Sequence, residues 1–505
     1  MTTKIRQVIP LARTPPDARI CAAMPTALPL LLVSGVLAVA ALPTVAVAQG
    51  DAWLSEGRCR LATDALPAAY ARCGTLAVPL DPTAPAGPKV EVFVARLGAF
   101  SAEPRLDPLL LIAGGPGQST VDFYLQLRGA FEPARRDRDI ILVDQRGTGR
   151  SAEGFACEVP DDLSIDTAPA EQLNRVLDAC IAELDHDPRF YTTSVAVQDL
   201  ERVRAALGIA QWNVYGVSYG TRVAQHYLRR YPERVRALVL DGVVPPPLAL
   251  GPDVAREAQR ALEQIFARCA ADAQCGTRFA ALPQLFTEVL ARLDAGAAEE
   301  TDPPPLTALE LRTLVRFMSY SAATVALLPV LISEAHAGNY APLAGQARTL
   351  LRELPEALSF PMSSSVTCTE DAPYVADGAT GGLDATYLGT GIMDALRLIC
   401  GRWPVGAIDA DFKTSVVSDT PVLLLSGEYD PITPPAYAER VKADGLRNSV
   451  HLIGRGQGHG LAGVGCVPRI MRSFLDVPDP GHLDAICLER EPPTPFFVSL
   501  FGPAP

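Results

Sequence analysis

The sequence is poor in the residues that build metal sites. Only six histidines occur among its 505 residues. It contains no CxxC pair and no His/Cys spacing typical of zinc sites. We therefore expect no metal ion and no other cofactor.

A cluster of basic residues is also missing. The net charge of -13 and a pI near 5.1 disfavour nucleic acids and anionic membrane surfaces as partners. Internal repeats and low-complexity segments are absent as well. With 48% hydrophobic and 20% charged residues, the composition is that of an ordinary globular protein able to bury a large core.

The first fifty residues are typical of a targeting sequence. An apolar stretch, 27–47, ends in Ala46-Val47-Ala48, which resembles a signal-peptidase site. Four basic residues precede this stretch: Lys4, Arg6, Arg13 and Arg19. We predict that residues 1–48 are a signal peptide and that the protein is exported, to a periplasm or beyond, with no stable membrane association after cleavage.

Two alternatives stay open for this segment. Met24 could be the true start, although that would leave no basic residue before the apolar stretch. The stretch is also close to membrane-spanning length, so it could be an uncleaved anchor. Interruptions at Pro29, Gly35 and Pro43 favour the signal peptide.

Cysteine usage agrees with export. Of eleven cysteines, Cys21 would leave with the signal, and the remaining even number implies disulfides in an exported chain. They form consecutive couples separated by long gaps, and short loops are the easiest to close. Other connectivities are possible, but we predict nearest-neighbour pairing: Cys59 with Cys73, Cys157 with Cys180, Cys269 with Cys275, Cys368 with Cys400, and Cys466 with Cys487.

Residues 216–220 form a Gly-x-Ser-x-Gly motif around Ser218. An apolar stretch, 212–215, precedes it, and a helical stretch, 221–231, follows and stops at Pro232. This order of strand, turn and helix is typical of a serine nucleophile, because a strained turn exposes the hydroxyl and leaves no room for flanking side chains. We interpret Ser218 as a nucleophile rather than as a serine in an ordinary glycine-rich turn.

The histidine partner should follow the serine in the chain. Beyond Ser218, His336, His451 and His459 are candidates. His451 belongs to an alternating apolar run and reads as a strand residue. His459 lies in the glycine-rich loop 454–460 just after that run, where a sheet of this kind presents functional groups. We predict His459 as the base, with a solvated loop histidine as the alternative.

Asp430 is the predicted acid of the triad. It lies in a turn directly after the apolar strand 421–426, and it would orient the imidazole and stabilise the imidazolium. Asp241 is a rival, because it follows another apolar strand, 237–240, although Asp241-Gly242 also reads as a turn. Glu428 is a weaker rival.

The loop 113–117 follows the apolar strand 109–112 and contains three glycines. Its backbone could approach a reacting carbonyl, so we predict an oxyanion hole formed by the amides of Gly115 and Tyr219. The loop is not a phosphate-binding motif, because it lacks the required Lys and Ser/Thr.

Together these motifs resemble the prolyl aminopeptidase and tripeptidyl aminopeptidase branch of the α/β-hydrolases, over nearly the whole mature chain. The resemblance implies the triad Ser218, Asp430 and His459. One departure is Ala113, where many prolyl aminopeptidases have histidine, and it argues against strict prolyl specificity. The segments that carry the resemblance are 114–117, 144–151, 216–220, 427–434 and 456–460.

Strand and helix signals alternate along the chain, which indicates a mostly parallel, doubly wound sheet, here an α/β-hydrolase fold. Residues 197–207 are apolar at helical spacing and stop at Gly208, before the nucleophile strand. We expect Arg146 to brace the site without being catalytic. Early strands are expected at 76–80 and 90–95, and later ones at 140–143 and 421–426.

The alternation breaks after Asp241, where three consecutive prolines follow, and strand signals return only near Pro421. We predict an inserted helical lid at 245–415 between two parts of the hydrolase core, 49–244 and 416–505. The lid would fold over Ser218 and wall the substrate pocket. An appendage far from the site is the alternative.

The resemblance implies a serine exopeptidase that releases short N-terminal peptides or single residues from a peptide substrate. Such an enzyme needs a carboxylate for the substrate ammonium. Glu370 and Asp371, beside Cys368, are candidates. A secreted carboxylesterase with the same triad is the alternative, and a catalytically silent binding protein is a third reading that the intact motifs disfavour.

Overall fold

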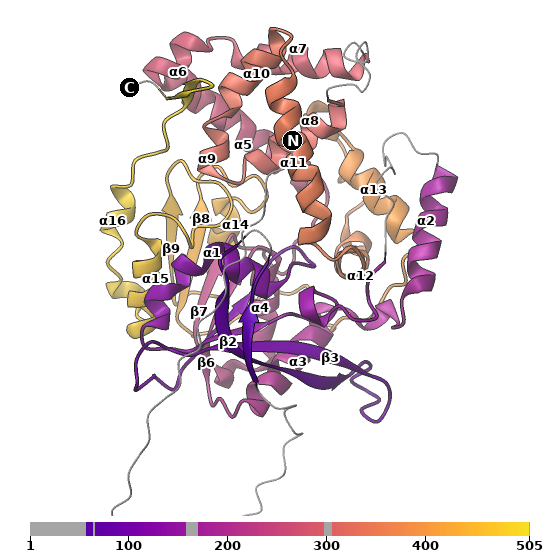
Figure 1. The fold of residues 1–505 in the computed structure, drawn as a ribbon, viewed down its shortest axis with the longest axis vertical. Coiled ribbons are helices and arrows are strands. Elements are labelled where there is room, and N and C mark those ends of the chain that lie inside the picture. The colour runs from indigo at the N-terminus through magenta and orange to yellow at the C-terminus, as the bar shows by residue number, and fades with distance from the viewer. Residues whose placement is uncertain (1–56, 64–65, 158–169, 297–305, 504–505) are drawn as a thin grey trace, which may run out of the picture. The chain divides into compact units, whose positions relative to one another are not determined.

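The computed structural model describes residues 57–63, 66–157, 170–296 and 306–503 (Figure 1). The predicted signal peptide, residues 1–48, lies outside these ranges. Within them, no helix is both long and apolar enough to cross a membrane.

A nine-stranded sheet forms the core, in the order β1-β2-β3-β5-β4-β6-β7-β8-β9. The first three strands and β5 pair antiparallel, and every neighbouring pair from β5 to β9 is parallel. The strands are β1 (Gly57–Leu61), β2 (Ala69–Pro79), β3 (Lys89–Leu97), β4 (Leu109–Ile112), β5 (Ile140–Val143), β6 (Trp212–Val217), β7 (Val235–Asp241), β8 (Val422–Gly427) and β9 (Ser449–Gly454). A separate hairpin pairs β10 (Phe497–Ser499) with β11 (Gly502–Pro503).

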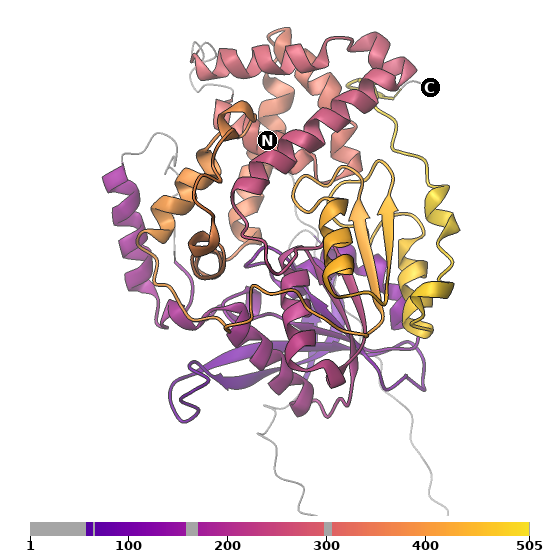
Figure 2. The same cartoon turned by 180° about the vertical axis from the view of Figure 1, so that it is seen from behind.

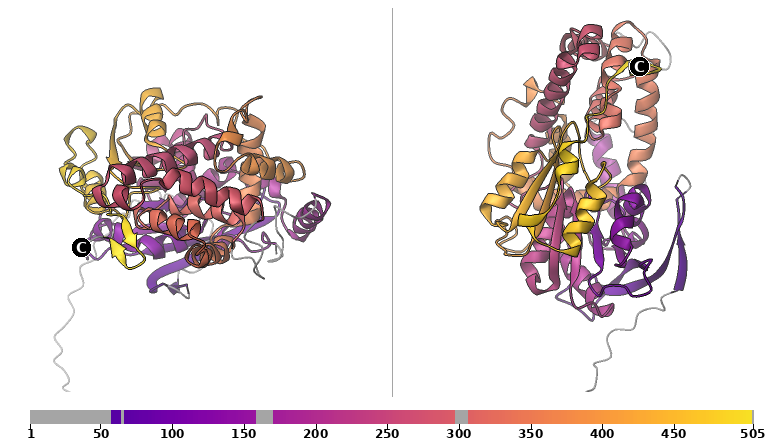
Figure 3. Two further views of the ribbon diagram at one scale, coloured as in Figure 1. Left: turned by 90° about the horizontal axis from the view of Figure 1, so that it is seen from above. Right: turned by 90° about the vertical axis from the view of Figure 1, so that its left-hand side faces the viewer.

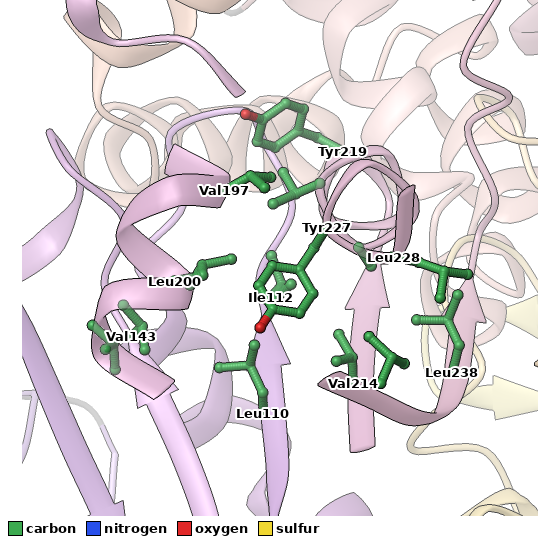
Figure 4. Packing of buried hydrophobic residues seen from close by; sticks show 14 of the residues in the cluster. Leu110, Ile112, Val143, Val197, Leu200, Val214, Tyr219, Tyr227, Leu228 and Leu238 are labelled. Carbon is green, nitrogen blue, oxygen red and sulfur yellow. The ribbon is translucent and has the colours of Figure 1, made fainter. Parts of the chain in front are cut away.

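Helices cover both faces of this sheet, because strands such as β4 and β5 are apolar and buried on both sides. One face packs against α3, α4 and α14, and the other against α1 and α15. Figure 4 shows Val197 and Leu200 of α3 and Tyr227 of α4 over the strands. These helices are α1 (Thr120–Arg135), α3 (Thr193–Ala206), α4 (Tyr219–Arg230), α14 (Pro435–Asp444) and α15 (Val467–Asp476).

Between β7 and β8 the chain forms the helices α5 to α13, which enclose an apolar core of their own. Figures 1 and 2 show α5 to α10 above the carboxyl ends of β8 and β9 and α12 and α13 to one side, and the left panel of Figure 3 shows the segment from above. We call this segment the lid. Its helices are α5 (Pro252–Ala271), α6 (Ala273–Arg278), α7 (Leu282–Asp294), α8 (Ala308–Met318), α9 (Ala322–Val325), α10 (Leu328–His336), α11 (Ala341–Ala357), α12 (Phe360–Glu370) and α13 (Gly391–Cys400).

Two more helices are peripheral: α2 (Ala170–Glu183) and α16 (Ile486–Glu489). The sequence did not indicate α2 or β1. Short 3₁₀ turns occur at η1 (Gly149–Ser151), η2 (Pro188–Phe190), η3 (Pro232–Arg234), η4 (Ala372–Tyr374), η5 (Leu383–Ala385) and η6 (Pro480–His482). The predicted α/β-hydrolase fold class is confirmed by this sheet and its helices.

The ten cysteines beyond Cys21 pair as the nearest-neighbour scheme predicts, with sequence separations from 6 to 32 residues. Each bridge joins segments that are adjacent in the chain. The bridges are Cys59–Cys73, Cys157–Cys180, Cys269–Cys275, Cys368–Cys400 and Cys466–Cys487.

Candidate active site

Ser218 lies in the sharp turn between β6 and α4. Its backbone has φ 56° and ψ -126°, and it is the one non-glycine residue with positive φ in the described part of the chain. A Cβ at Gly216 would collide with the carbonyl oxygen of Gly220, and a Cβ at Gly220 with that of Ile112. The motif's glycines are therefore required by close backbone contact, and the strained serine matches the geometry of a nucleophile elbow.

Two backbone amides face the same turn. Tyr219 is the first residue of α4, and Gly115 lies in the loop after β4, where φ is 105°. That loop touches the serine, since a Cβ at Gly114 would lie 3.0 Å from the Ser218 Cβ. Among the described residues, neither amide has a hydrogen-bond acceptor, whereas the Gly114 amide donates to Gln118 Oε1 at 3.2 Å. Gly115 and Tyr219 thus keep their N–H groups available for an oxyanion.

His459 and Asp430 are hydrogen-bonded, with His459 Nδ1 2.8 Å from Asp430 Oδ2. Burial lowers the pKa of His459, but the charge and hydrogen bond of Asp430 outweigh it, so the net pKa is raised. Burial raises the pKa of Asp430. The contacts with His459 and nearby amides outweigh this effect and keep the pKa of Asp430 below its ordinary value. The structure thus joins two of the three residues predicted for the triad by a hydrogen bond.

Thr433 is a residue of this site that sequence reasoning missed. Its hydroxyl donates to Asp430 Oδ2 at 2.7 Å and lies 3.1 Å from His459 Nδ1. The amides of Ile432 and Thr433 donate to Asp430 Oδ1 at 2.9 and 2.8 Å. This is an Asx-type turn, and the sequence Asp-Pro-Ile-Thr contains the signal for it. The hydrogen bonds of this turn orient the Asp430 carboxylate independently of its contact with the imidazole.

The end of β7 connects the serine and the histidine. Ser218 donates its amide hydrogen to the carbonyl of Asp241 at 2.9 Å. The imidazole of His459 packs on the next residue, because a Cβ at Gly242 would lie 2.9 Å from His459 Cε1. Ser218, Asp430 and His459 therefore all follow strands of the parallel part of the sheet, β6, β8 and β9.

Asp241 and Glu428, the rival acids, both have other partners. The Asp241 carboxylate accepts from the amides of Leu461 and Ala462 and from the hydroxyl of Tyr215 at 2.8 Å. Burial raises the pKa of Asp241. Glu428 accepts from the amide of Gly456 at 2.7 Å. Both carboxylates accept hydrogen bonds from the loop that carries His459, and of the three acids only Asp430 is hydrogen-bonded to the imidazole.

The lid touches this machinery at three points. The His459 amide donates to the carbonyl of Tyr320 at 2.8 Å, and the two rings are 5.0 Å apart. Arg260 Nη2 donates to the Asp430 carbonyl at 2.9 Å. Beside the oxyanion loop, the Ser359 amide donates to the carbonyl of Gly117 at 3.0 Å. The predicted alternative, an appendage far from the site, does not fit these contacts.

Glu370 and Asp371, proposed from sequence as anchors for a substrate ammonium, are fully buried and occupied. Glu370 accepts from the amide of Thr193 at 2.7 Å and its hydroxyl at 2.9 Å. Asp371 accepts from both terminal nitrogens of Arg222, at 2.8 and 3.1 Å. Burial raises the pKa of Glu370 to about 7. This geometry does not fit the amine-binding role: both acids tie the lid to α3 and α4.

Arg146 is likewise a structural residue. It is buried and pairs with Asp199 of α3 at 2.6 and 2.9 Å, and it also donates to the carbonyls of Pro79, Leu80 and Phe190. It therefore braces the core behind the site. Across the described ranges, no group of three or more side chains has the composition of a metal site.

Comparison with known families agrees with this architecture. A family model described as alpha/beta hydrolase fold matches residues 107–286, and one described as TAP-like protein matches residues 386–487. The sheet and the first match together show an α/β-hydrolase fold. The C-terminal part of the chain is similar to the TAP-like family.

Three curated proteins illustrate the relationship. Serine protease Hip1 of Mycobacterium tuberculosis (strain H37Rv) is 29% identical over 283 residues, 52% of this chain and 53% of that protein. Tripeptidyl aminopeptidase of Streptomyces lividans is 29% identical over 192 residues, 35% of this chain and 36% of that protein. Carboxylesterase B of Mycobacterium tuberculosis (strain CDC 1551 / Oshkosh) is 29% identical over 415 residues, 72% of this chain and 76% of that protein. The chain thus spans about half of Hip1 and about a third of the tripeptidyl aminopeptidase.

Proposed function

We propose that the protein is an exported serine exopeptidase, which releases short N-terminal peptides or single residues through a Ser218–His459–Asp430 triad. The observation that carries the proposal is the 2.8 Å contact between His459 and Asp430, at the strand ends where Ser218 adopts positive φ. The five disulfides support export, because such bonds persist in oxidising compartments.

In acylation, the hydroxyl of Ser218 attacks the carbonyl carbon of the scissile bond while neutral His459 takes its proton. The tetrahedral oxyanion accepts hydrogen bonds from the amides of Gly115 and Tyr219. Asp430 stabilises the imidazolium during this step. His459 then returns the proton to the leaving nitrogen, the C–N bond breaks, and Ser218 carries the acyl group as an ester.

Deacylation follows the same steps, with water as the nucleophile. His459 removes a proton from a water molecule, the resulting hydroxide attacks the acyl-enzyme, and the same two amides hold the second oxyanion. The proton passes back to the Ser218 oxygen as the C–O bond breaks. Asp430 and Thr433 keep the imidazole in one orientation through both half-reactions.

Two findings support a peptidase. The TAP-like match covers the segment that contains Asp430 and His459, and two of the three relatives described above are named as peptidases. An exopeptidase that recognises an amino terminus also needs an acidic residue that binds the substrate ammonium. Glu370 and Asp371 are hydrogen-bonded to Thr193 and Arg222 instead. The anchor residue is therefore not part of the proposal.

The proposal is tested with chromogenic aminoacyl and tripeptidyl amides and their N-acetylated counterparts, with Ser218→Ala as the background. We expect turnover of the free-amine substrates that depends on Ser218 and is lost on acetylation. Equal turnover of free and acetylated amides would contradict the exopeptidase and indicate an endopeptidase.

A carboxylesterase is the second candidate, favoured by the match to carboxylesterase B over 72% of this chain. The same triad would cleave an ester and would need no ammonium anchor. Short-chain p-nitrophenyl esters discriminate the two. Ser218-dependent hydrolysis of esters without any amide turnover would replace the peptidase by the esterase.

A further inference from the structure

The lid presents hydrogen-bond donors without acceptors on the side that faces His459. Arg316 lies near the end of α8. Its Nε is buried and has no hydrogen-bond partner within the described residues, and its Nη2 donates only to the hydroxyl of Tyr320, at 3.3 Å. Arg312, one turn earlier, shows the contrast, because its two terminal nitrogens bind Asp294 at 2.9 and 2.8 Å. In the described part of the chain, Arg316 has no carboxylate partner.

Arg316 lies beside the catalytic histidine candidate. The Tyr320 ring, which Arg316 contacts, is 5.0 Å from the His459 ring. Burial and the charge of Arg316 both lower the pKa of His459, against the larger effect of Asp430. A cation in this position disfavours the imidazolium that His459 must form. A second role for Arg316 would explain why a cation lies there.

Tyr387 supplies a second, independent observation. Its side chain is 7% exposed, yet its hydroxyl has no hydrogen-bond partner among the described residues. Arg312 holds the residue in place by donating to its carbonyl at 2.9 Å. Burial raises the pKa of Tyr387, while the nearby Arg316 charge lowers it. The hydroxyl therefore stays protonated and lies in the field of the same guanidinium.

An unpaired guanidinium and a buried hydroxyl are costly unless an anion completes them. A carboxylate fits both: it accepts two parallel hydrogen bonds from a guanidinium and keeps lone pairs for a hydroxyl. We propose that Arg316, with the hydroxyls of Tyr387 and Tyr320, binds a carboxylate of the substrate close to the scissile bond. The inference rests on the proposed function only in placing hydrolysis at Ser218.

Two sources of this carboxylate share the chemistry. It can be the free C-terminus of a short leaving peptide, or an acidic side chain on the acyl part. Either would make the enzyme prefer small acidic substrates. The charge would also hold the substrate against the lid, and the lid is the segment that positions His459 through Tyr320.

Three matched substrate pairs test the proposal, each differing in one carboxylate. The first pair is a short peptide acid and its C-terminal amide, the second has Glu or Gln on the acyl side, and the third is p-nitrophenyl hemisuccinate and its methyl ester. We expect the carboxylate member of at least one pair to be favoured in kcat/KM by about tenfold or more, the range of charge-assisted hydrogen bonds. The favoured pair identifies the source.

Arg316→Gln should remove the preference by lowering kcat/KM for the carboxylate member far more than for its neutral partner. Arg316→Lys should retain part of it, and Tyr387→Phe should weaken it. Arg397→Gln is the control, because Arg397 is an exposed lid arginine paired with exposed Asp394. This variant should have the same kcat/KM as the parent for both members of each pair. The ester pair keeps the test valid if no amide is cleaved, so failure of the peptidase proposal is seen separately.

The proposal is overturned if the parent shows no carboxylate preference in any pair. It is also overturned if Arg316→Gln lowers kcat/KM equally for both members of a pair. That result would mean that Arg316 acts only through its effect on the charge of His459. Circular dichroism and thermal unfolding of each variant identify a loss of fold, and a variant that fails this check is replaced by Arg316→Met. A preserved preference in a folded Arg316→Met protein likewise contradicts the proposal.

Discussion

At the residue scale, the proposed chemistry depends on a serine whose backbone conformation is unfavourable. A non-glycine residue with positive φ costs on the order of 1–3 kcal/mol, which persists only where the surroundings fix it. Here the fixing contacts are the Ser218 amide on the Asp241 carbonyl and the Thr221 hydroxyl, which donates to the Ser218 carbonyl at 2.6 Å. Hydrogen bonds at both the amide and the carbonyl of the serine thus hold this one strained residue.

The triad assignment predicts strongly non-additive substitutions. Ser218→Ala and His459→Ala should each lower kcat by up to about 10⁶-fold, and the double variant by no more, because the residues act as a unit. Asp430→Asn should cost about 10⁴-fold by disturbing the imidazole tautomer. Steady-state kinetics on an activated ester measures all four.

Asp241→Asn is the matched control for Asp430→Asn, since both acids are buried at strand ends. Asp241 contacts backbone amides rather than the imidazole, so its substitution should be the milder. The reverse ranking would transfer the acid role to Asp241, and losses that multiply across Ser218 and His459 would show that one of them is wrongly assigned.

The pH dependence follows from the His459–Asp430 couple. The base must be neutral, so kcat/KM should rise with pH through the pKa of His459, which lies above the ordinary histidine value. Asp430→Asn removes the main cause of that increase, while burial, which lowers the pKa, remains. The inflection should therefore move to lower pH in Asp430→Asn, as measured on an activated ester from pH 5 to 10. An unmoved or higher inflection would contradict the couple.

Local signals indicated Ser218, Asp430 and His459 as candidates, because each lies in a turn or loop directly after a strand. They could not rank Asp430 above Asp241 on structural grounds, since both follow buried strands and only the contact with the imidazole distinguishes them. Glu370 and Asp371 were misinterpreted for a related reason. Their burial and their partners Thr193 and Arg222 depend on contacts across more than a hundred residues.

At the element scale, the turn between α8 and α9 acts on the loop after β9. A Cβ at Gly458 would lie 2.5 Å from the carbonyl oxygens of Ser319 and Tyr320. The loop therefore packs backbone to backbone against the lid, and the adjacent His459 amide bonds to Tyr320. No sequence pattern reveals such a contact, because the two segments are separated by the rest of the lid and the strand β8.

Gly458→Ala should displace this loop and lower kcat by about 100-fold, the effect of a catalytic group moved by roughly an ångström. Gly463→Ala is the control within the same loop, because its added Cβ would meet only Leu127 Cδ2 at 3.5 Å. Kinetics on an activated ester, together with thermal unfolding, separates misplacement from instability. Equal losses in the two variants would show that the lid contact has no special role.

The Cys466–Cys487 bridge joins the start of α15 to α16, just after the loop that carries His459. Replacing both cysteines by serine should reduce activity at temperatures where the protein is still folded, because hydrogen bonds, among them those with Asp241, Glu428 and Tyr320, then hold the loop without the covalent bridge. Activity and circular dichroism measured along one thermal ramp test this. Simultaneous loss of both signals would place the bridge in global stability only.

At the scale of the whole molecule, the lid is joined to the core without a covalent bridge in the described ranges, since every disulfide links neighbouring segments. The attachment is instead ionic and buried. Arg222 of α4 pairs with Asp371 at 2.8 Å and with Glu370 at 3.5 Å, and Lys413 lies 3.5 Å from Asp371. Burial lowers the pKa of Lys413 to about 8. Four ionisable groups thus share one interface, in which Arg222, Glu370 and Asp371 are fully buried.

Breaking one member of such a cluster should cost more than removing a matched pair. Arg222→Met leaves Asp371 buried without its main partner, and we expect a loss of about 3–5 kcal/mol in the free energy of unfolding. In Arg222→Met/Asp371→Leu, the stranded charge is gone, so the double variant should lose clearly less than the sum of the single losses. Chemical denaturation of all four proteins completes the cycle. Arg397→Gln, at an exposed ion pair, sets the baseline of about 0–1 kcal/mol. If the two single losses simply add, Arg222 and Asp371 are not coupled, and the lid must be attached mainly through the backbone contacts of Tyr320 and Ser359.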